Sequence, residues 1–344
     1  MATTITDIAK SINVSPAMVS RVIHNSGYVS KEKRELIEKT LSELNYVPNK
    51  VAQGLKSQKT GMIGHILPRA YPNPFWAGLC QAIDEYADEC DYQILRLFTY
   101  NDPKRELKQI EEMVARKVDG VIFTNASSKE NIQRVVDMGI PTVMVERPLD
   151  VMGVDKVLID YVEASYVATK HLLQLNHKNI GYIGVDTSVN VVESERYNGF
   201  QRALMEEKIT ADNKFIKFCK SYSPQYGFHL MEEMILSDSL PSGIFVASDV
   251  LAIGVLQALY KHRIRVPDDI SIIGYDNSYA DILSPPISSV GLPLKEMGEA
   301  AINLILERMK SKNTSVKTLI LHASYVERES VKHNINQEVE SDGT

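Results

Sequence analysis

Apolar positions recur at helical spacing in three short runs within residues 1–47. The first run predicts a helix that Thr6 caps and that Asn13, a residue that tolerates the left-handed conformation, ends. In the third run we expect Ser30 to cap the helix and its core-facing positions to be Leu36, Ile37, Leu41 and Leu44. Three helices of this length predict a small all-α domain with one shared apolar centre.

The second run lies in the stretch VSPAMVSRVI, which begins at Val14. Ser15 followed by Pro16 is typical of a helix start, and a tight turn separates this helix from the first, as in a helix-turn-helix. In that motif the second helix enters the DNA major groove. Its polar face would present Ala17, Ser20, Arg21 and His24. The alternative is a surface helix in an unrelated bundle.

The next segment, PNKVAQGLKS at residues 48–57, is too short for a stable isolated helix and contains Gly54. A helix here would have one apolar edge, made by Val51, Ala52 and Leu55. An apolar wedge in a DNA minor groove could support such a helix. A plain interdomain linker is the other interpretation of the same position.

From Gly61 onward, apolar runs alternate with helical stretches, which predicts an α/β domain. The first series of buried strands is MIGHILP, YQILRLF, DGVIFT and PTVMVE, followed by KVLIDY. The second series is NIGYIGV, KFIKFC, SGIFVAS and ISIIGYD. Two successive series of similar pattern indicate two doubly wound, parallel-sheet subdomains.

Ligands of such sheets bind beyond the carboxyl ends of the strands, and those positions are polar or aromatic here. They include Phe75, Trp76, Glu146, Arg147, Asp160, Arg196, Tyr222, Ser248, Asp249 and Asp276. Aromatic faces with carboxylates and an arginine suit a small polyol. Helix capping by Asp160 and Asp249, and a core or dimer role for Phe75 and Trp76, are the structural alternatives.

Charge and composition narrow the function classes. Residues 1–60 contain nine Lys and Arg against five acidic residues, a net +4, so the remainder carries −10 of the total −6. A basic head on an acidic body suggests a polyanionic partner for the head, although a solvated helical surface would give the same count. The three cysteines have no metal-site spacing and suggest reduced cytosolic thiols. The sequence shows no secretion signal or membrane span, and no phosphate loop, nucleophile elbow or zinc motif of an enzyme.

The stretch from ITDIAKSINVSPAMVSRVI through YVPNKVAQGLKS resembles the headpiece and hinge of the lactose/galactose repressor family. The motifs HKNIGYIG and RVPDDISIIGYDN in the body are also similar to that family. The resemblance implies an all-α helix-turn-helix headpiece and a periplasmic-binding-protein-like α/β core with three crossovers between its subdomains. It also implies a homodimer whose hinge helices pair in the minor groove of a palindromic operator.

Positions matching the family's motifs, together with the patterns above, give the candidate site residues. The candidate DNA contacts are Thr4, Thr6, Ser15, Pro16, Ala17, Ser20, Arg21, His24 and Ser30 in the headpiece, with Asn49, Val51, Ala52, Gln53 and Leu55 in the hinge. The resemblance adds Asn190 to the ten candidate effector-binding residues above. Glu146 stands where the family often has Asp, with Arg147 beside it, which allows a ligand with a carboxylate.

We expect a headpiece at 1–47, a hinge at 48–60, a core at 61–330 and a polar tail at 331–344. The core would comprise one subdomain at about 61–160 and 292–316 and another at about 161–291 and 317–330. The tail lacks a leucine heptad, so a dimer is expected rather than a coiled-coil tetramer.

The expected function is that of a cytoplasmic transcriptional repressor that senses a sugar, sugar acid or sugar phosphate. It would be no enzyme and would need no metal or cofactor. The alternatives are a solute-binding protein with the same core fold and a purine-type regulator that responds to a corepressor.

Overall fold

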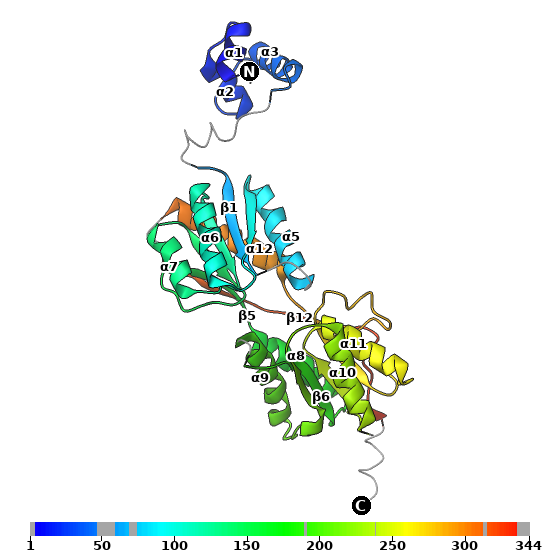
Figure 1. The fold of residues 1–344 in the computed structure, drawn as a ribbon. Coiled ribbons are helices and arrows are strands. Elements are labelled where there is room, and N and C mark those ends of the chain that lie inside the picture. The colour runs from blue at the N-terminus through cyan, green and yellow to red at the C-terminus, as the bar shows by residue number, and fades with distance from the viewer. Residues whose placement is uncertain are drawn as a thin grey trace, which may run out of the picture. The chain divides into compact units, whose positions relative to one another are not determined.

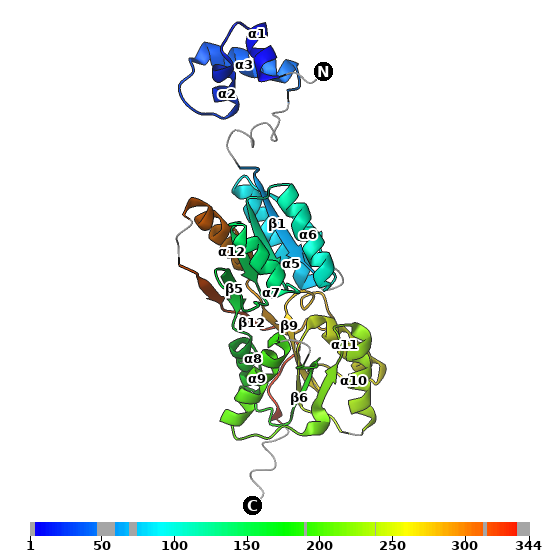
Figure 2. The same ribbon diagram turned by 60° about the vertical axis from the view of Figure 1, so that its left-hand side comes forward.

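The computed structural model describes residues 4–46, 59–68, 74–188, 191–237, 239–311 and 315–335. The chain divides after Thr60 into two compact units, an N-terminal headpiece and a larger α/β core (Figures 1 and 2). The predicted fold class, a helix-turn-helix headpiece followed by a core of two mostly parallel sheets, is confirmed. No helix in the described ranges has the length and apolarity to cross a membrane.

The headpiece consists of α1 (Ile5–Ser11), α2 (Pro16–Ile23) and α3 (Lys31–Glu43). Its core is made by one apolar face from each helix: Ile8, Ala9, Val19, Val22 and Ile37. Asn13 takes the left-handed conformation with φ 53°, and the Ser15 hydroxyl accepts a hydrogen bond from the Met18 amide at 3.2 Å. These local features produce the expected tight turn between α1 and α2.

Three local predictions for the headpiece are wrong. Thr4, not Thr6, caps α1, because Thr4 and Asp7 form a reciprocal capping box. The residue three positions after Thr6 is Ala9, which has no side-chain acceptor for such a box. Leu36 and Leu44 are 44% and 46% exposed, since only Ile37 and the partly buried Leu41 of α3 face the other two helices. Ser30 does precede α3, but its side chain makes no capping hydrogen bond.

The first sheet of the core has the strand order β11-β5-β4-β3-β1-β2, and all its strands are parallel. In chain order its strands are β1 (Met62–Leu67), β2 (Gln93–Phe98), β3 (Gly120–Thr124), β4 (Thr142–Val145), β5 (Asp155–Ile159) and β11 (Thr318–Leu321). Helices α6 (Pro103–Ala115) and α7 (Lys129–Asp137) share one apolar cluster with this sheet. Helices α5 (Pro74–Glu89) and α12 (Leu294–Lys310) share another (Figure 2).

The second sheet has the order β12-β10-β9-β8-β6-β7, and only β12 runs antiparallel to its neighbour. Its strands are β6 (Ile180–Val185), β7 (Ile216–Cys219), β8 (Gly243–Val246), β9 (Ser271–Asp276), β10 (Ser288–Gly291) and β12 (Ser324–Val326). Helices α8 (Tyr161–Gln174) and α9 (Val191–Glu206) pack on one another, as do α10 (Pro224–Leu236) and α11 (Asp249–Lys261).

The chain passes between the two sheets three times, as the resemblance implied: after β5, after β10 and after β11. The expected boundary at residue 317 is wrong, because β11 pairs with β5 in the first sheet from Thr318↔Lys156 to Leu321↔Ile159. The last passage therefore lies between Leu321 and Ser324. The second strand series was expected to end at β9, but β10 and β12 extend that sheet.

Candidate functional site

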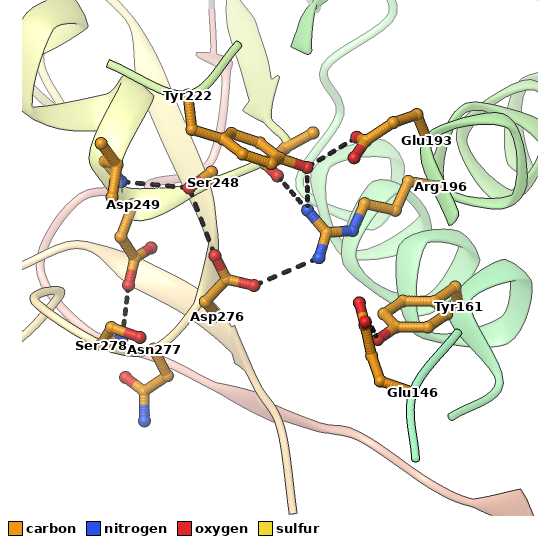
Figure 3. Close-up of polar contacts among 12 residues, drawn as sticks. Glu146, Tyr161, Glu193, Arg196, Tyr222, Ser248, Asp249, Asp276, Asn277 and Ser278 are labelled. Atoms are coloured by element: carbon orange, nitrogen blue, oxygen red, sulfur yellow. Dashed lines mark hydrogen bonds and ion pairs between the residues drawn. The ribbon is translucent and has the colours of Figure 1, made fainter. Parts of the chain in front are cut away.

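Polar side chains from both core subdomains meet where strands of the two sheets end (Figure 3). Glu146 and Arg147 follow β4 of the first sheet, while Asp276 closes β9 of the second. Glu146 has φ 73° and Asp276 has φ 90°, a conformation that side-chain-bearing residues rarely adopt and that often marks functional positions. The rule that ligands bind beyond the carboxyl ends of strands therefore directs attention to this cluster.

Arg196, on α9, is the centre of the cluster. Its Nη1 donates to the Tyr222 hydroxyl and to the Ala247 carbonyl oxygen, both at 2.7 Å, and its Nη2 donates to Asp276 Oδ1 at 3.2 Å. The guanidinium also lies over the ring of Tyr275, 4.2 Å from its centroid. Such charge-assisted bonds and aromatic contacts hold the buried guanidinium in one orientation.

A second arginine links the two subdomains. Arg147 Nε donates to Glu146 Oε1 at 3.1 Å, and its Nη2 lies 3.7 Å from Glu193 Oε1 on α9. The Tyr161 hydroxyl, at the start of α8, donates to Glu146 at 3.3 Å. Tyr222 completes the link, because its hydroxyl donates to Glu193 Oε2 at 2.6 Å. One hydrogen-bonded network thus joins residues after β4 to residues on α8 and α9.

Burial dominates the electrostatics of these carboxyls. It raises the pKa of Glu146 above its ordinary value, although Arg147 and Arg196 act in the opposite direction. It likewise raises the pKa of Asp276, against the effect of Arg196. Desolvation disfavours a charged carboxylate unless a partner compensates, so both groups gain from any further polar partner.

Two of the ionisable side chains in this cluster each have a buried polar atom without a hydrogen-bond partner, Glu146 Oε2 and Arg196 Nε. One is an acceptor when ionised and the other is a donor. Leaving such atoms unpaired is unfavourable, and an exception in a folded protein calls for an explanation. A ligand hydroxyl can both donate and accept, so a polyol has the groups that these two atoms lack.

The predicted aromatic residues reach this cluster through Arg147. Phe75 and Trp76 lie in the first turn of α5, are buried, and contact each other edge to face with centroids 4.8 Å apart. Arg147 lies over the Trp76 ring, 5.9 Å from its centroid. Both aromatic residues also belong to an apolar cluster of the core, so the structural alternative describes part of their role.

Three predicted residues play supporting structural parts. Asp160 caps α8, where its Oδ1 accepts from the Glu163 amide at 2.9 Å. The Ser248 hydroxyl caps α11 and donates to Asp276 Oδ2 at 3.2 Å. Asp249 accepts from the Ser278 amide at 2.7 Å and so fixes the segment after Asp276. Asn190 lies outside the described residues.

The structure adds two residues that sequence reasoning did not select, Tyr161 and Glu193. Both are on helices, whereas the strand-end rule selects residues that directly follow strands. Glu193 precedes Arg196 by three positions on α9, so a helical reading places the two side chains on one face. Tyr161 directly follows the candidate Asp160. Among described residues, no group of three or more His, Cys, Asp or Glu side chains is arranged to hold a metal ion.

The headpiece leaves most of its predicted DNA contacts at the surface. Thr6, Ser15, Pro16, Ala17, Arg21 and His24 are exposed, and Ser20 and Ser30 are half-buried. The Thr4 residue is exposed too, but its hydroxyl is engaged with Asp7 at 2.6 Å. The hinge candidates Asn49, Val51, Ala52, Gln53 and Leu55 lie outside the part of the chain that the structure describes.

Comparisons with known proteins agree with this architecture. Residues 4–49 match the family described as bacterial regulatory proteins, lacI family, and residues 169–331 match a periplasmic binding protein-like domain. The chain is 36% identical to the HTH-type transcriptional regulator DegA of Bacillus subtilis, over 96% of this chain and 98% of that protein. It is 32% identical to the ribose operon repressor of Haemophilus influenzae, over 95% and 98% of the two chains.

The fold is similar to that of a solved structure of the lac repressor dimer bound to operator and the anti-inducer ONPF. The TM-score is 0.81 with 22% sequence identity, and the match covers 96% of this chain and 100% of that one. At this identity the likeness bears on the fold, which agrees from the headpiece through both core subdomains.

Proposed function

Since the chain belongs to the lacI family of bacterial regulatory proteins, we propose that it represses transcription by binding a palindromic operator as a homodimer under the control of a sugar or sugar derivative. A DNA-binding headpiece and a ligand-binding core place the chain among transcriptional regulators. The observation that supports the effector site is the buried network around Arg196, in which Glu146 Oε2 and Arg196 Nε have no partner.

In the headpiece, the exposed polar face of α2 would read the operator. Ala17 allows close approach to the bases, and Arg21 can donate two hydrogen bonds to guanine O6 and N7. Ser15, Ser20, Ser30 and His24 suit phosphates or base edges, as do Thr4 and Thr6 near the start of α1. Solute binding alone does not require a DNA-binding headpiece, so the headpiece favours a regulator over a free solute-binding protein.

In the core, each part of the network has a role. Arg196 and Asp276 would bind ligand hydroxyls, and Glu146 would accept a hydrogen bond from another. Phe75 and Trp76 would lie against the apolar face of the sugar. Tyr222 and Ser248 orient Arg196 and Asp276, while Asp249 and Asp160 hold the backbone around them.

Ligand binding would act on DNA through the relation of the two core subdomains. The network already contains residues of both, so a ligand that adds bonds within it favours one arrangement over others. The hinge at 48–60, with Leu55 as its expected wedge, would transmit that change to the operator. A coupling free energy of about 1–3 kcal/mol is enough for a switch of roughly 5–150-fold.

The same proposal includes a cytoplasmic location and the absence of catalysis. The relatives are transcriptional regulators, and operator DNA is a cytoplasmic partner in bacteria. In the described network the carboxyls and guanidiniums bond one another, an arrangement that suits the binding of a polar ligand.

Two measurements test this function. Selection of bound duplexes from a random pool should enrich a palindromic sequence, and a pool without enrichment would rule out an operator-specific protein. A thermal-shift screen of sugars, sugar derivatives and nucleobases should find a compound that raises the melting temperature, because a ligand that binds only the folded state stabilises it. Stabilisation by nucleobases alone would favour the purine-type alternative.

A further inference from the structure

We propose that the core site selects its effector by charge: it accepts an uncharged or amino-substituted polyol, excludes sugar acids and sugar phosphates, and owes this selectivity to Glu193. The inference rests on the proposed function, because it concerns the ligand of the same site. It narrows the sequence-based expectation, in which Arg147 beside Glu146 allowed a ligand with a carboxylate.

Acidic groups outnumber basic ones among the described residues of the network. Glu146, Glu193 and Asp276 supply three carboxyls (Figure 3), and Arg147 and Arg196 supply two guanidiniums. All three carboxyl residues are buried, with Glu193 only 1% exposed. Burial already raises the pKa of Glu146 and Asp276, so their ionised forms are unfavourable even with two guanidiniums nearby. An anionic ligand would add a further negative charge beside these acidic groups, where water cannot screen it.

Arg147, the residue that would attract an acid, already has two acidic partners. Its Nε donates to Glu146, and its Nη2 forms an ion pair with Glu193. Glu193 is itself held in place by the Tyr222 hydroxyl at 2.6 Å. A ligand carboxylate or phosphate could reach Arg147 only by displacing a buried carboxylate, which would then lose its counter-ion.

Arg196, like Arg147, already has partners within the protein, and these take most of its own N–H groups. Three of its N–H groups donate to Tyr222, Ala247 and Asp276, and Asp276 lies directly beside the guanidinium. The unpaired Nε can donate to a neutral hydroxyl at no electrostatic cost. The unpaired Glu146 Oε2 needs a donor, which a hydroxyl or an ammonium group has and an ionised carboxylate or phosphate lacks.

Glu193 is the residue to vary, because it neutralises Arg147 from the other subdomain without being one of the atoms left open for the ligand. Glu193→Gln keeps the size of the side chain and an acceptor for Tyr222 but removes one negative charge. Arg147 would then keep Glu146 as its one acidic partner in the described network, and its Nη2 could bind a ligand anion. Glu206→Gln makes the same change on the exposed end of the same helix and serves as the matched control.

The experiment uses the full chain and a panel in which each parent sugar is present in four forms: neutral, 2-amino, uronic acid and phosphate ester. Glucose, galactose and ribose are the parents, the amino and uronic forms being used where the parent allows them. Thermal shift identifies binders, and calorimetry then gives the affinity for each form. We expect the wild type and Glu206→Gln to bind only neutral or amino forms, and Glu193→Gln to raise the acid-to-neutral affinity ratio at least tenfold.

Wild-type binding of an acid or phosphate as tight as that of its neutral parent would overturn the charge selectivity and leave the sugar-sensing function standing. An unchanged ratio in folded Glu193→Gln would overturn the role of Glu193. If that variant fails to fold, Glu146→Gln, which also removes an acidic partner of Arg147, tests the charge selectivity through the same affinity ratio, and an unchanged ratio would overturn it. Failure of every sugar form to bind would instead overturn the proposed sugar effector, and the charge selectivity with it.

Discussion

Asp249 shows how a residue beside the site can affect the whole chain without touching a ligand. Its side chain is buried and accepts hydrogen bonds from Ser289 Oγ at 2.8 Å and the Ser278 amide at 2.7 Å. Burial raises its pKa to about 6 even though these bonds favour the ionised form. The Asp249 carboxylate also contributes to the raised pKa of Asp276. The second subdomain therefore contains two acidic groups whose pKa burial raises, Asp249 on α11 and Asp276 on β9.

The pKa of Asp249 predicts a pH dependence of stability. In the folded chain this carboxyl keeps its proton up to about pH 6, whereas an unfolded Asp loses it near pH 3.9. Its contribution to stability is therefore fully present below the unfolded pKa and is lost as the pH rises through the folded pKa, to a total on the order of 3 kcal/mol.

Thermal unfolding between pH 4 and 7 checks this. The melting temperature of the wild type should fall relative to that of Asp249→Asn as the pH rises. Asp281 is an exposed carboxyl in the same subdomain. The difference in melting temperature between the wild type and Asp281→Asn should therefore stay the same across this pH range. If the melting temperatures of the wild type and Asp249→Asn change with pH in parallel, burial does not raise the pKa of Asp249.

In the headpiece, Arg21 is the residue expected to read a base. It is exposed on α2, where a bidentate pair with guanine would discriminate by about 1–3 kcal/mol, and a dimer would lose two such pairs. We predict that Arg21→Ala loses the preference for operator over random duplex while weak binding to any DNA survives. Lys39→Ala, which removes an exposed charge from α3, should keep the preference. Gel-shift titrations that find equal discrimination in Arg21→Ala and the wild type would exclude base readout by this face.

At the scale of elements, the helix pair α10 and α11 depends on a backbone contact. A Cβ at Gly254 would overlap the carbonyl oxygen of Pro224 and lie 2.5 Å from the Phe228 nitrogen. Both obstacles are backbone atoms, so no side chain can move aside. The two helices can therefore pack as closely as they do only with glycine at this position.

We predict that Gly254→Ala destabilises the core by about 1–3 kcal/mol or more, the usual cost of overpacking. Gln257→Ala, an exposed change on the same helix, should have little effect. Urea unfolding followed by circular dichroism measures both. Equal midpoints for Gly254→Ala and the wild type would mean that α10 and α11 separate easily.

Element prediction from the sequence succeeded where a strand forms a mostly apolar run, whether it is fully buried as β3 is or only partly buried as β2 is. The nine strands from β1 to β9 all correspond to apolar runs that the sequence shows directly. The three that were missed, β10, β11 and β12, have only four, four and three residues. In β11 the residues Leu319 and Ile320 are exposed at a sheet edge, so neither length nor burial pattern distinguishes it from a loop.

At the scale of the whole molecule, the candidate site belongs to neither core subdomain alone. Glu146 and Arg147 come from the first, whereas Tyr161, Glu193 and Arg196 come from the second. The strand-end rule found the first pair and Asp276. Arg196 was selected as the start of a helix, which is wrong, because α9 begins at Val191 and Arg196 lies in its second turn. The contact between Glu193 and Arg147 could not be predicted, because the relative position of two subdomains depends on packing between distant segments. The sequence therefore predicts individual residues of the site better than the contacts between them.

The proposed function requires that a ligand in the core controls operator binding by the headpiece. The most direct test is the operator dissociation constant, measured with and without a ligand that stabilises the wild type, for the wild type, Asp276→Ala and the exposed control Asp281→Ala. We predict that the ligand changes the constant roughly 5–150-fold in the wild type and in Asp281→Ala. In Asp276→Ala the ligand should have no effect, while the ligand-free constant stays near the wild-type value. A wild-type operator constant that is the same with and without bound ligand, or a full ligand response in Asp276→Ala, would contradict the account.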